Sequence, residues 1–221
     1  MRLTHLGHAC LLVEVAGTRL LVDPGVYSPD FTTLTELDAI LLTHQHADHV
    51  DPDRLPALVA GNPDAQVIAE PETAALLLDH AGDELSPISL AGQETTMVGS
   101  ITVEGVGARH AFNHDGVPRC GNTGFVITAG GEPTLFHPGD AYDGEPAPQV
   151  DVLALPVNAP WTAVRDTLDF ANRISPRWVV PIHDALLSDL GREGYLAHVD
   201  GFTSKATVLQ DLYDRPPWDV G

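Results

Sequence analysis

The stretch Ala39-Ile40-Leu41-Leu42-Thr43-His44-Gln45-His46-Ala47-Asp48-His49 decides the fold. Its first five residues form a short, mainly apolar run that is typical of a buried strand. Four side chains that bind metals follow within six residues, where the chain leaves the strand and turns toward a helix. Imidazole suits zinc, iron and related ions, and a carboxylate adds negative charge for a second cation. The stretch therefore predicts a metal site at the carboxyl end of a strand.

The order of these ligands indicates two ions rather than one. Side chains alternate along an extended chain, so His44 and His46 point the same way and can share a metal. Asp48 and His49 come after the chain begins to turn, and they can face a different ion nearby. An isolated loop histidine is usually solvated or caps a helix. Three histidines and one aspartate in this order, directly after a buried strand, favour metal binding.

Short apolar segments on both sides of this stretch predict an α/β chain. Strands are expected at residues 3–6, 10–15, 19–22, 39–43, 66–69, 94–98, 101–106, 123–128, 133–136, 150–155 and 177–182. Helices are expected after the Asp51-Pro52 pair, which supplies an N-cap and a proline in the first turn, at 71–80 and at about 162–174. This order predicts two packed sheets with helices outside, as a single domain over residues 1–221.

Composition limits the kinds of partner. The chain has 221 residues, 43% of them apolar, which is enough to build the core of one domain. It carries 31 Asp and Glu against 11 Lys and Arg, a formal net charge of −20. Nucleic-acid binders need a positive face, and a body this acidic repels nucleic acids and anionic lipids at long range. Apart from its simpler role in solubility, the charge favours a small-molecule substrate over a nucleic acid or a membrane.

The cysteines and the N-terminal residues point to a reducing compartment. Cys10 and Cys120 cannot form a disulfide framework, and both are expected to be buried, inert thiols. The first twelve residues lack the continuous apolar region and the cleavage site of a signal peptide. No apolar run has the length needed to span a bilayer. We therefore expect a cytoplasmic protein, and the sequence leaves open whether it forms a homo-oligomer.

Several segments together resemble the metallo-β-lactamase-fold superfamily. The pattern His-x-His-x-Asp-His at 44–49 resembles its signature. The segments Gly7-His8-Ala9 and Leu21-Val22-Asp23-Pro24 resemble those of the branch related to ascorbate-6-phosphate lactonase and other metal-dependent hydrolases. Downstream, the superfamily's order is matched by His110, by Asp140 in Pro138-Gly139-Asp140 and by His183 in Pro181-Ile182-His183. The resemblance covers nearly the whole chain and implies a four-layer αββα sandwich, with the metals at one edge between the sheets.

The resemblance also assigns the metal ligands to two groups around one shared carboxylate. It implies that His44, His46 and His110 bind metal one, that Asp48, His49 and His183 bind metal two, and that Asp140 bridges them. The implied cofactors are two divalent metal ions, with zinc favoured and manganese or iron as alternatives. The residues support this independently, because His110, Asp140 and His183 each lie at or just beyond a predicted strand end.

Neighbouring polar residues allow more than one interpretation. His114 competes with His110 as the third ligand of metal one; we favour His110, which ends its strand more directly, and leave His114 as a contact to substrate or to a ligand. His8 either approaches the site or makes a backbone hydrogen bond in a turn. Asp23 is expected to orient a metal-bound histidine. Trp161 either lines the pocket or packs in the core at a helix start. Two further residues, His137 and Asn122, are expected to be structural.

The resemblance implies a hydrolase in which two cations share a metal-bridging hydroxide that is available at neutral pH. Asp48 is the expected catalytic residue, accepting or passing on a proton while it binds metal two. The expected substrate is a small-molecule ester, lactone or similar bond, with a phosphodiesterase of the same fold as the alternative. A non-catalytic metal-binding or sensor protein and a di-iron oxidoreductase are the alternatives from other classes. Arg109 and Arg119 are the obvious anion clamps, so a substrate with a single carboxylate or phosphate remains compatible with the sequence.

Overall fold

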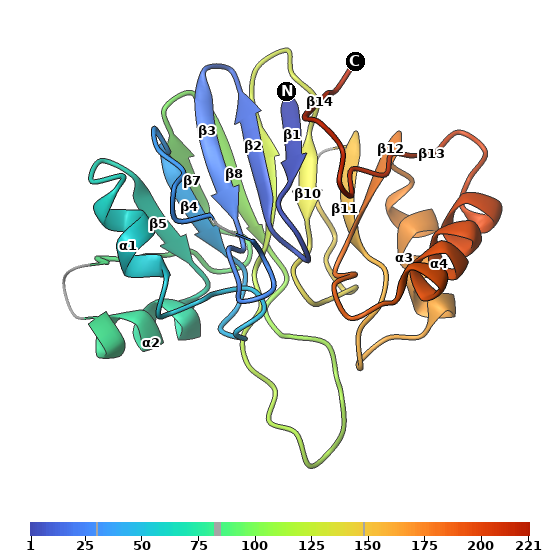
Figure 1. Cartoon of the computed structure of the whole chain (residues 1–221), viewed down its shortest axis with the longest axis horizontal. Helices are drawn as coiled ribbons and strands as arrows, with labels where there is room; N and C mark the ends of the chain where they lie inside the picture. The colour runs from blue at the N-terminus through green and yellow to red at the C-terminus, as the bar shows by residue number, and fades with distance from the viewer. Residues whose placement is uncertain (30, 82–84, 148) are drawn as a thin grey trace.

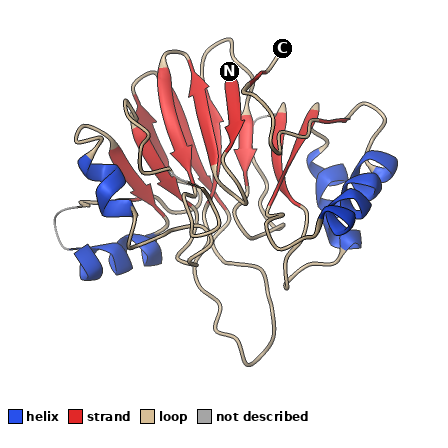
Figure 2. Ribbon diagram, viewed as in Figure 1, coloured by secondary structure: helices blue, strands red, loops and turns tan. Residues whose placement is uncertain are grey.

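Two seven-stranded sheets stack face to face in the computed structural model of the chain, with helices on both outer sides (Figure 1, Figure 2). The structure describes residues 1–29, 31–81, 85–147 and 149–221. The strand order is β14-β1-β2-β3-β4-β5-β6 in the first sheet and β13-β12-β11-β10-β9-β8-β7 in the second. The first sheet is therefore built from residues 2–89 together with the last strand, and the second sheet from residues 95–209.

The strands are short and the helices are separated into two pairs. The first sheet contains β1 (Arg2–His5), β2 (Leu11–Val15), β3 (Thr18–Val22), β4 (Ala39–Leu42), β5 (Gln66–Ala69), β6 (Ile88–Ser89) and β14 (Trp218–Asp219). The second contains β7 (Thr95–Val98), β8 (Ile101–Val106), β9 (Gly124–Thr128), β10 (Leu135–His137), β11 (Val152–Pro156), β12 (Trp178–Ile182) and β13 (Val208–Leu209). The helices are α1 (Leu55–Ala60), α2 (Pro71–Ala81), α3 (Val164–Ile174) and α4 (Asp189–Phe202). Figure 2 shows α1 and α2 beside the first sheet, and α3 and α4 beside the second.

Three apolar clusters hold the four layers together. The central cluster lies between the sheets and joins Val13 and Ile68 of the first to Val103, Ile127 and Val180 of the second. Neighbouring side chains along a strand point to opposite faces, so the alternate residues pack outward against the helices. These outer clusters include Leu12, Ile40, Leu58 and Leu77 on one side, and Val126, Leu153, Phe170 and Leu196 on the other. Burial on both faces of both sheets confirms the predicted αββα sandwich.

Helix α1 begins later than the Asp51-Pro52 pair predicts. The Asp51 carboxylate accepts hydrogen bonds from the N–H groups of Asp53 and Arg54 at 3.1 and 3.0 Å. The carbonyl of Asp51 accepts a further bond from the N–H of Leu55. These bonds close a turn ahead of the regular helix, as an Asp side chain often does. The predicted start was therefore too early, because the aspartate caps a turn and not the helix itself.

The elements beyond residue 183 differ most from the sequence prediction. Helix α4 was not predicted, and it contains Gly191, Gly194 and Gly201, which lower its intrinsic helix propensity. Strand β14 pairs antiparallel with β1, placing Trp218 opposite Leu3. Outside this region, strand β6 was also not predicted, and it has only two residues. Such short edge strands depend on pairing with distant partners, which a local sequence pattern does not reveal.

The strands that lead to the predicted metal ligands end at one edge of the sandwich. In the first sheet β1, β3 and β4 run in one direction, and in the second β8, β10, β11 and β12 do so. The residues that follow these strands include His8, Asp23, His44, His110, Asp140, Trp161 and His183. The loop between β8 and β9 extends far beyond this edge (Figure 1). Ligands in α/β proteins commonly bind in the loops at the carboxyl ends of strands.

Candidate metal centre

Eight side chains with metal-ligating atoms converge at this edge. They form three overlapping groups, within each of which the ligand atoms lie within 4.8 Å of one another. The groups are His44, His46 and His110; His8, Asp48, His49 and His183; and His44, His49 and Asp140. His46 and Asp48 are half-buried, and the other six are buried. The third group connects the other two, so the ligand atoms form one continuous cluster.

Four of these histidines direct the same ring nitrogen toward the cluster because a partner holds the other one. The Nδ1 of His110 donates to the Ala111 carbonyl at 2.7 Å, and the Nδ1 of His183 donates to the Asn158 carbonyl at 2.6 Å. The remaining two such bonds run from His49 Nδ1 to Asp23 Oδ2 at 2.7 Å and from His44 Nδ1 to Thr43 Oγ1 at 3.1 Å. Outer hydrogen bonds of this kind fix the tautomer of a metal-binding histidine and leave its Nε2 for the ion.

His46 is oriented the other way. Its Nδ1 lies 3.1 Å from His44 Nε2, inside the cluster, while its Nε2 lies 3.7 Å from Cys120 Sγ. Burial raises the pKa of the Cys120 thiol to about 11, so it is neutral at pH 7. The sequence predicted Cys120 as a buried, inert thiol, and the structure places that thiol against the outer nitrogen of a predicted ligand.

Several buried polar atoms at the centre lack a hydrogen-bond partner within the part of the chain that the structure describes. They are His49 Nε2, His110 Nε2, His183 Nε2 and Asp140 Oδ1. Buried polar atoms normally form hydrogen bonds, so a cluster of them without such bonds calls for an explanation, and metal binding is one. Imidazole nitrogens and a carboxylate oxygen that face one another are a suitable donor set for divalent metals. The residues present therefore fit the metal ions that the resemblance implies.

Asp140 lies between the two histidine groups. Its Oδ1 is 3.1 Å from His49 Nε2, and its Oδ2 is 3.2 Å from His183 Nε2 and 3.4 Å from His110 Nε2. Trp161 donates from Nε1 to the same Oδ2 at 2.8 Å. A carboxylate with both oxygens facing histidines on opposite sides has the position expected of a bridging ligand.

The turn before Asp140 depends on close packing. Gly139 has a φ of +61°, and a Cβ there would meet Asn122 Oδ1 at 2.3 Å and Thr43 Cβ at 2.8 Å. Asn122 is buried, accepts the Asp140 N–H at 2.9 Å and donates to the Pro138 carbonyl at 2.9 Å. Glycine is thus the residue that this turn accommodates. Asn122 is structural, as predicted, but its hydrogen bonds also orient the central carboxylate.

Asp48 is the most exposed member of the second group, and the buried His8 contacts it. Asp48 Oδ2 lies 3.1 Å from His8 Nε2 and 3.4 Å from His183 Nε2. Burial opposes ionisation of Asp48, but its contacts with His183 and His8 hold its pKa well below the ordinary value. The His8 side chain is fully buried and its backbone has a φ of +52°. His8 therefore contacts the cluster through Nε2, while its Nδ1 accepts a backbone N–H, that of Ala185, so both features weighed from the sequence are present.

Burial and mutual contacts shift the pKa values of the carboxylate and the histidines in the cluster. Burial opposes ionisation of Asp140, but the neighbouring His49 and His183 outweigh it, and the pKa of Asp140 lies well below its usual range. Burial lowers the pKa of His183, but Asp140 and Asp48 together outweigh it and raise that pKa to about 9. Burial keeps the pKa of His44 well below normal, so this ring is neutral. The ionised carboxylate at the centre thus depends on positive charge around it, which His49 and His183 provide here and which divalent cations could provide in their place.

Some of the remaining predicted residues contact the cluster and others do not. His114 is exposed, and its Nδ1 accepts the N–H of Gly116 within its own loop, so it does not join the cluster. Asp23 is buried and accepts hydrogen bonds from Thr43 and His49. His137 is buried, and its Nε2 bonds the Ala9 carbonyl at 2.9 Å, which agrees with a structural role. Sequence reasoning missed Thr43, whose hydroxyl connects Asp23 to His44.

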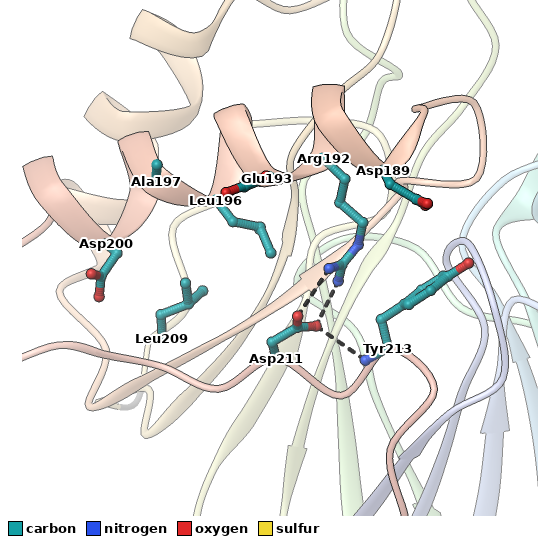
Figure 3. A pocket seen from close by; sticks show the side chains of 9 residues that line it. All are labelled: Asp189, Arg192, Glu193, Leu196, Ala197, Asp200, Leu209, Asp211 and Tyr213. Carbon is teal, nitrogen blue, oxygen red and sulfur yellow. Dashed lines mark hydrogen bonds and ion pairs between the residues drawn. The ribbon is translucent and has the colours of Figure 1, made fainter.

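Arg192 of α4 connects the segment after His183 to the C-terminal part of the chain, and Figure 3 shows its side chain directed at Asp211 beside Tyr213. Its Nε donates to Asp184 Oδ2 at 2.6 Å, and its terminal nitrogens donate to Asp211 at 2.5 and 2.9 Å. The guanidinium lies over the Tyr213 ring, 4.5 Å from its centroid. Asp184 is fully buried, so this ion pair holds the residue next to a predicted ligand in place. No local signal in the sequence indicated these contacts.

Comparison with known proteins decides the family. The family model described as "Beta-lactamase superfamily domain" matches residues 2–183. The chain belongs to the β-lactamase superfamily. The matched region runs from β1 to His183 and so includes every predicted metal ligand. Among the described residues of this β-lactamase superfamily protein, no helix is long and apolar enough to cross a membrane.

Curated relatives define the group more closely. The superfamily protein is 41% identical over 210 residues to Protein Rv0786c of Mycobacterium tuberculosis, covering 92% of this chain and 93% of the relative. It is 31% identical over 231 residues to a UPF0173 metal-dependent hydrolase of Azorhizobium caulinodans, covering 94% and 96%. The chain therefore belongs with the UPF0173 metal-dependent hydrolases, which confirms the predicted enzyme class. The narrower resemblance to the ascorbate-6-phosphate lactonase branch stays a prediction.

A solved structure supports the fold. Igni18, a metallo hydrolase from the archaeon Ignicoccus hospitalis, superimposes with a TM-score of 0.72, covering 100% of this chain and 99% of that one. The sequences are 22% identical, so this likeness concerns the arrangement of the sheets and helices alone.

Removing Asp23 is expected to weaken metal binding without touching a ligand. Asp23→Ala leaves the buried His49 Nδ1–H and the Thr43 N–H and O–H groups without their acceptor. Outer partners of this kind typically contribute about 10- to 100-fold to metal affinity. We expect a zinc titration to show a loss of that size in Asp23→Ala, with the far-UV circular dichroism unchanged.

The control for this titration is Asp38→Ala, which removes an exposed carboxylate just before β4, at the opposite end of the sheet. It should bind zinc like the wild type. The variant Asp23→Asn keeps the side-chain size while weakening the acceptor toward His49. Its zinc affinity should fall between those of Asp23→Ala and Asp38→Ala. Equal affinity in all three variants would mean that Asp23 does not orient His49.

Proposed function

We propose that the chain is a dinuclear metal-dependent hydrolase that cleaves an ester, lactone or similar bond of a small molecule. The observation that carries the proposal is a set of buried Nε2 atoms, those of His49, His110 and His183, that face the Asp140 carboxylate at 3.1–3.4 Å and have no hydrogen-bond partner among the described residues. Burying a polar atom without a hydrogen bond costs folding free energy, so a purely structural core is not expected to contain such a set.

The proposed ligands divide into two groups. His44, His46 and His110 would hold one ion, Asp48, His49 and His183 the other, and Asp140 would contact both. Zinc is the metal we favour, and manganese and iron have the same kind of ligands available. When bound, two such ions would polarise the scissile bond and supply an activated water at neutral pH.

The chain's own residues would position the reacting groups and move the proton. Asp48 is half-buried and its Oδ2 lies on the open side of the centre, within reach of His8 and His183, so it is the carboxylate placed to accept or pass on a proton. His8 contacts that same oxygen and is itself fixed by the backbone, since its Nδ1 accepts the N–H of Ala185 at 3.4 Å. Trp161 holds Asp140 from the opposite side. Asp48 is thus the proposed catalytic residue, with His8 keeping its carboxylate aimed at the substrate.

The charge of the protein supports a small substrate. The net charge of −20 opposes contact with a polyanion that must meet a large part of the surface. Two divalent ions would make only the centre locally positive, so a neutral or singly charged molecule can approach it. We therefore propose small-molecule substrates and no nucleic-acid or membrane partner.

A substrate screen tests this function. Zinc-loaded protein is assayed against lactones, thioesters, phosphodiesters and β-lactams, with Asp48→Ala as the inactive variant and Asp38→Ala as the matched carboxylate control. We expect hydrolysis in one of the first two classes, and a loss in Asp48→Ala of at least the roughly 100-fold that general acid–base groups supply. If the wild type cleaves only phosphodiesters, the ester assignment is wrong. If wild type and Asp48→Ala are equally inactive on every class, the hydrolase proposal loses its basis.

A further inference from the structure

Large apolar side chains are exposed on three loops at the edge that carries the metal centre, and a fourth loop there carries a half-buried aromatic residue. They are Tyr27, Phe112, Val117 and Leu186, with the half-buried Trp161 among them, and we refer to these five as the apolar rim. Exposed fractions of 46% for Tyr27, 54% for Phe112 and 58% for Leu186 leave much of each side chain in water. Single exposed apolar residues are ordinary, but a group that gathers at one functional edge marks a binding surface.

Two members of the rim touch the ligand cluster directly. The Tyr27 ring packs edge-on against His8, with ring centroids 5.2 Å apart. The Trp161 indole donates to Asp140, and its ring centroid lies 6.1 Å from that of His110. These contacts make the apolar surface continuous with the predicted metal ligands.

The other members lie on loops that are fastened to the same cluster. The N–H of Ala111, directly before Phe112, donates to the Asp140 carbonyl at 2.7 Å. The N–H of Ala185, directly before Leu186, donates to His8 Nδ1 at 3.4 Å. Val117 lies on the same loop as Phe112, between β8 and β9, which extends past the edge of the sandwich (Figure 1). Hydrogen bonds therefore attach the first residues of these loops to the ligand cluster, while the apolar side chains of the loops face solvent.

The arginines nearest to this loop are already engaged. Arg109 forms an ion pair with Glu72 at 3.2 Å, and Arg119 donates from Nε to the His110 carbonyl at 2.7 Å. Both were candidates for clamping an anionic substrate. These contacts direct part of each guanidinium to the protein itself, and the exposed apolar side chains offer a separate surface for recognition beside the centre.

We propose that the apolar rim binds an apolar acyl chain of the substrate next to the scissile bond. The substrate class is then a lactone or ester with an alkyl substituent, in place of a phosphorylated sugar or other highly polar molecule. This inference rests on the proposed hydrolase function and adds a substrate class to it. Each methylene that leaves water for the rim should strengthen binding roughly two- to fourfold.

A chain-length series of straight-chain hydroxamic acids tests the rim by binding alone. Hydroxamates chelate metals, so acetohydroxamate to decanohydroxamate can be titrated calorimetrically into the zinc-loaded protein with no reaction taking place. We expect affinity to rise roughly two- to fourfold per methylene over the first several carbons. The variant carrying Phe112→Ser and Leu186→Ser should lose most of this slope while its metal content stays that of the wild type.

The matched control carries Leu190→Ser and Phe202→Ser, which remove two exposed apolar side chains of helix α4. It should keep the wild-type slope. A flat series in the wild type, no binding of any member, or an equal loss of slope in both variants would overturn the rim proposal.

A parallel assay with esters of increasing chain length separates the two proposals. If the hydroxamate slope is present but no ester or lactone is cleaved, the rim stands and the hydrolase function fails. If short and long esters are cleaved equally well and the hydroxamate series is flat, the function stands and the rim fails.

Discussion

Asp140→Ala is expected to abolish hydrolysis and to reduce the metal content from the proposed two ions per chain to one at most. Asp140 lies 3.1–3.4 Å from the Nε2 atoms of three histidines that belong to both proposed metal groups. Two unit charges 4 Å apart repel by about 4 kcal/mol at an effective dielectric constant of about 20, and the charge product of two divalent ions is four times larger. Without the carboxylate between them, the two ions should not both be retained.

Metal content per chain, measured by inductively coupled plasma mass spectrometry after dialysis, gives the direct readout. Asp143→Ala is the matched control, because it removes an exposed aspartate three residues further along. Asp140→Asn should also lose an ion while keeping an acceptor for the Trp161 N–H. If Asp140→Ala kept two ions and full activity, Asp140 would not be the bridging ligand.

The second prediction with a large expected effect is a loss of metal in His110→Ala that His114→Ala does not show. His110→Ala should lose the ion of the first group, because it removes one of three nitrogens that converge within 4.8 Å. The loss of affinity should exceed the roughly 10- to 100-fold typical of an outer partner. His114→Ala should bind zinc normally and change stability by no more than about 0.5 kcal/mol, as is usual for a surface position.

Both variants are compared by zinc titration and by thermal unfolding of the metal-free protein, so that a loss of metal is not confused with a loss of fold. The reverse outcome, with His114→Ala losing metal and His110→Ala keeping it, would show that the long loop closes over the centre in solution and that our ligand assignment is wrong.

The parts of the fold that local patterns determine were predictable. The apolar run before His44 indicated a buried strand, and β4 is buried at all four residues. Strands 66–69 and 101–106 have the predicted bounds. Alternation and apolar runs reflect which face a side chain occupies, and that information is present in a single segment.

The parts that depend on distant contacts were not predictable in the same way. The sequence left His110 and His114 as competitors, because both follow β8 closely, and the structure separates them through the turn that brings His110 beside Asp140. The outer partners of His110 and His183 are the backbone carbonyls of Ala111 and Asn158, which have no side-chain signature. Such carbonyls become visible as partners only when the loops are in place.

At helix α4 and at the Asp51 turn, the sequence prediction failed for a different reason. Glycines lowered the helical signal of α4, yet packing of Leu196 and Val199 against the outer cluster of the second sheet stabilises it. Tertiary burial commonly outweighs intrinsic propensity in this way. Asp51 was predicted as the N-cap of α1, but its bonds close the preceding turn and Arg54 occupies the N-cap position.

The convergence of both sheets at one edge has a thermodynamic consequence. His44, His46, Asp48 and His49 follow β4 of the first sheet, whereas His110, Asp140 and His183 follow strands of the second. An ion held by residues of both groups binds only when the two sheets are docked, so it acts as a cross-link between halves of the chain that are distant in sequence. A ligand at 100 times its dissociation constant stabilises the form that binds it by about 2.7 kcal/mol. Metal supply would then set how firmly the two halves of the sandwich hold together, as well as whether the enzyme is active.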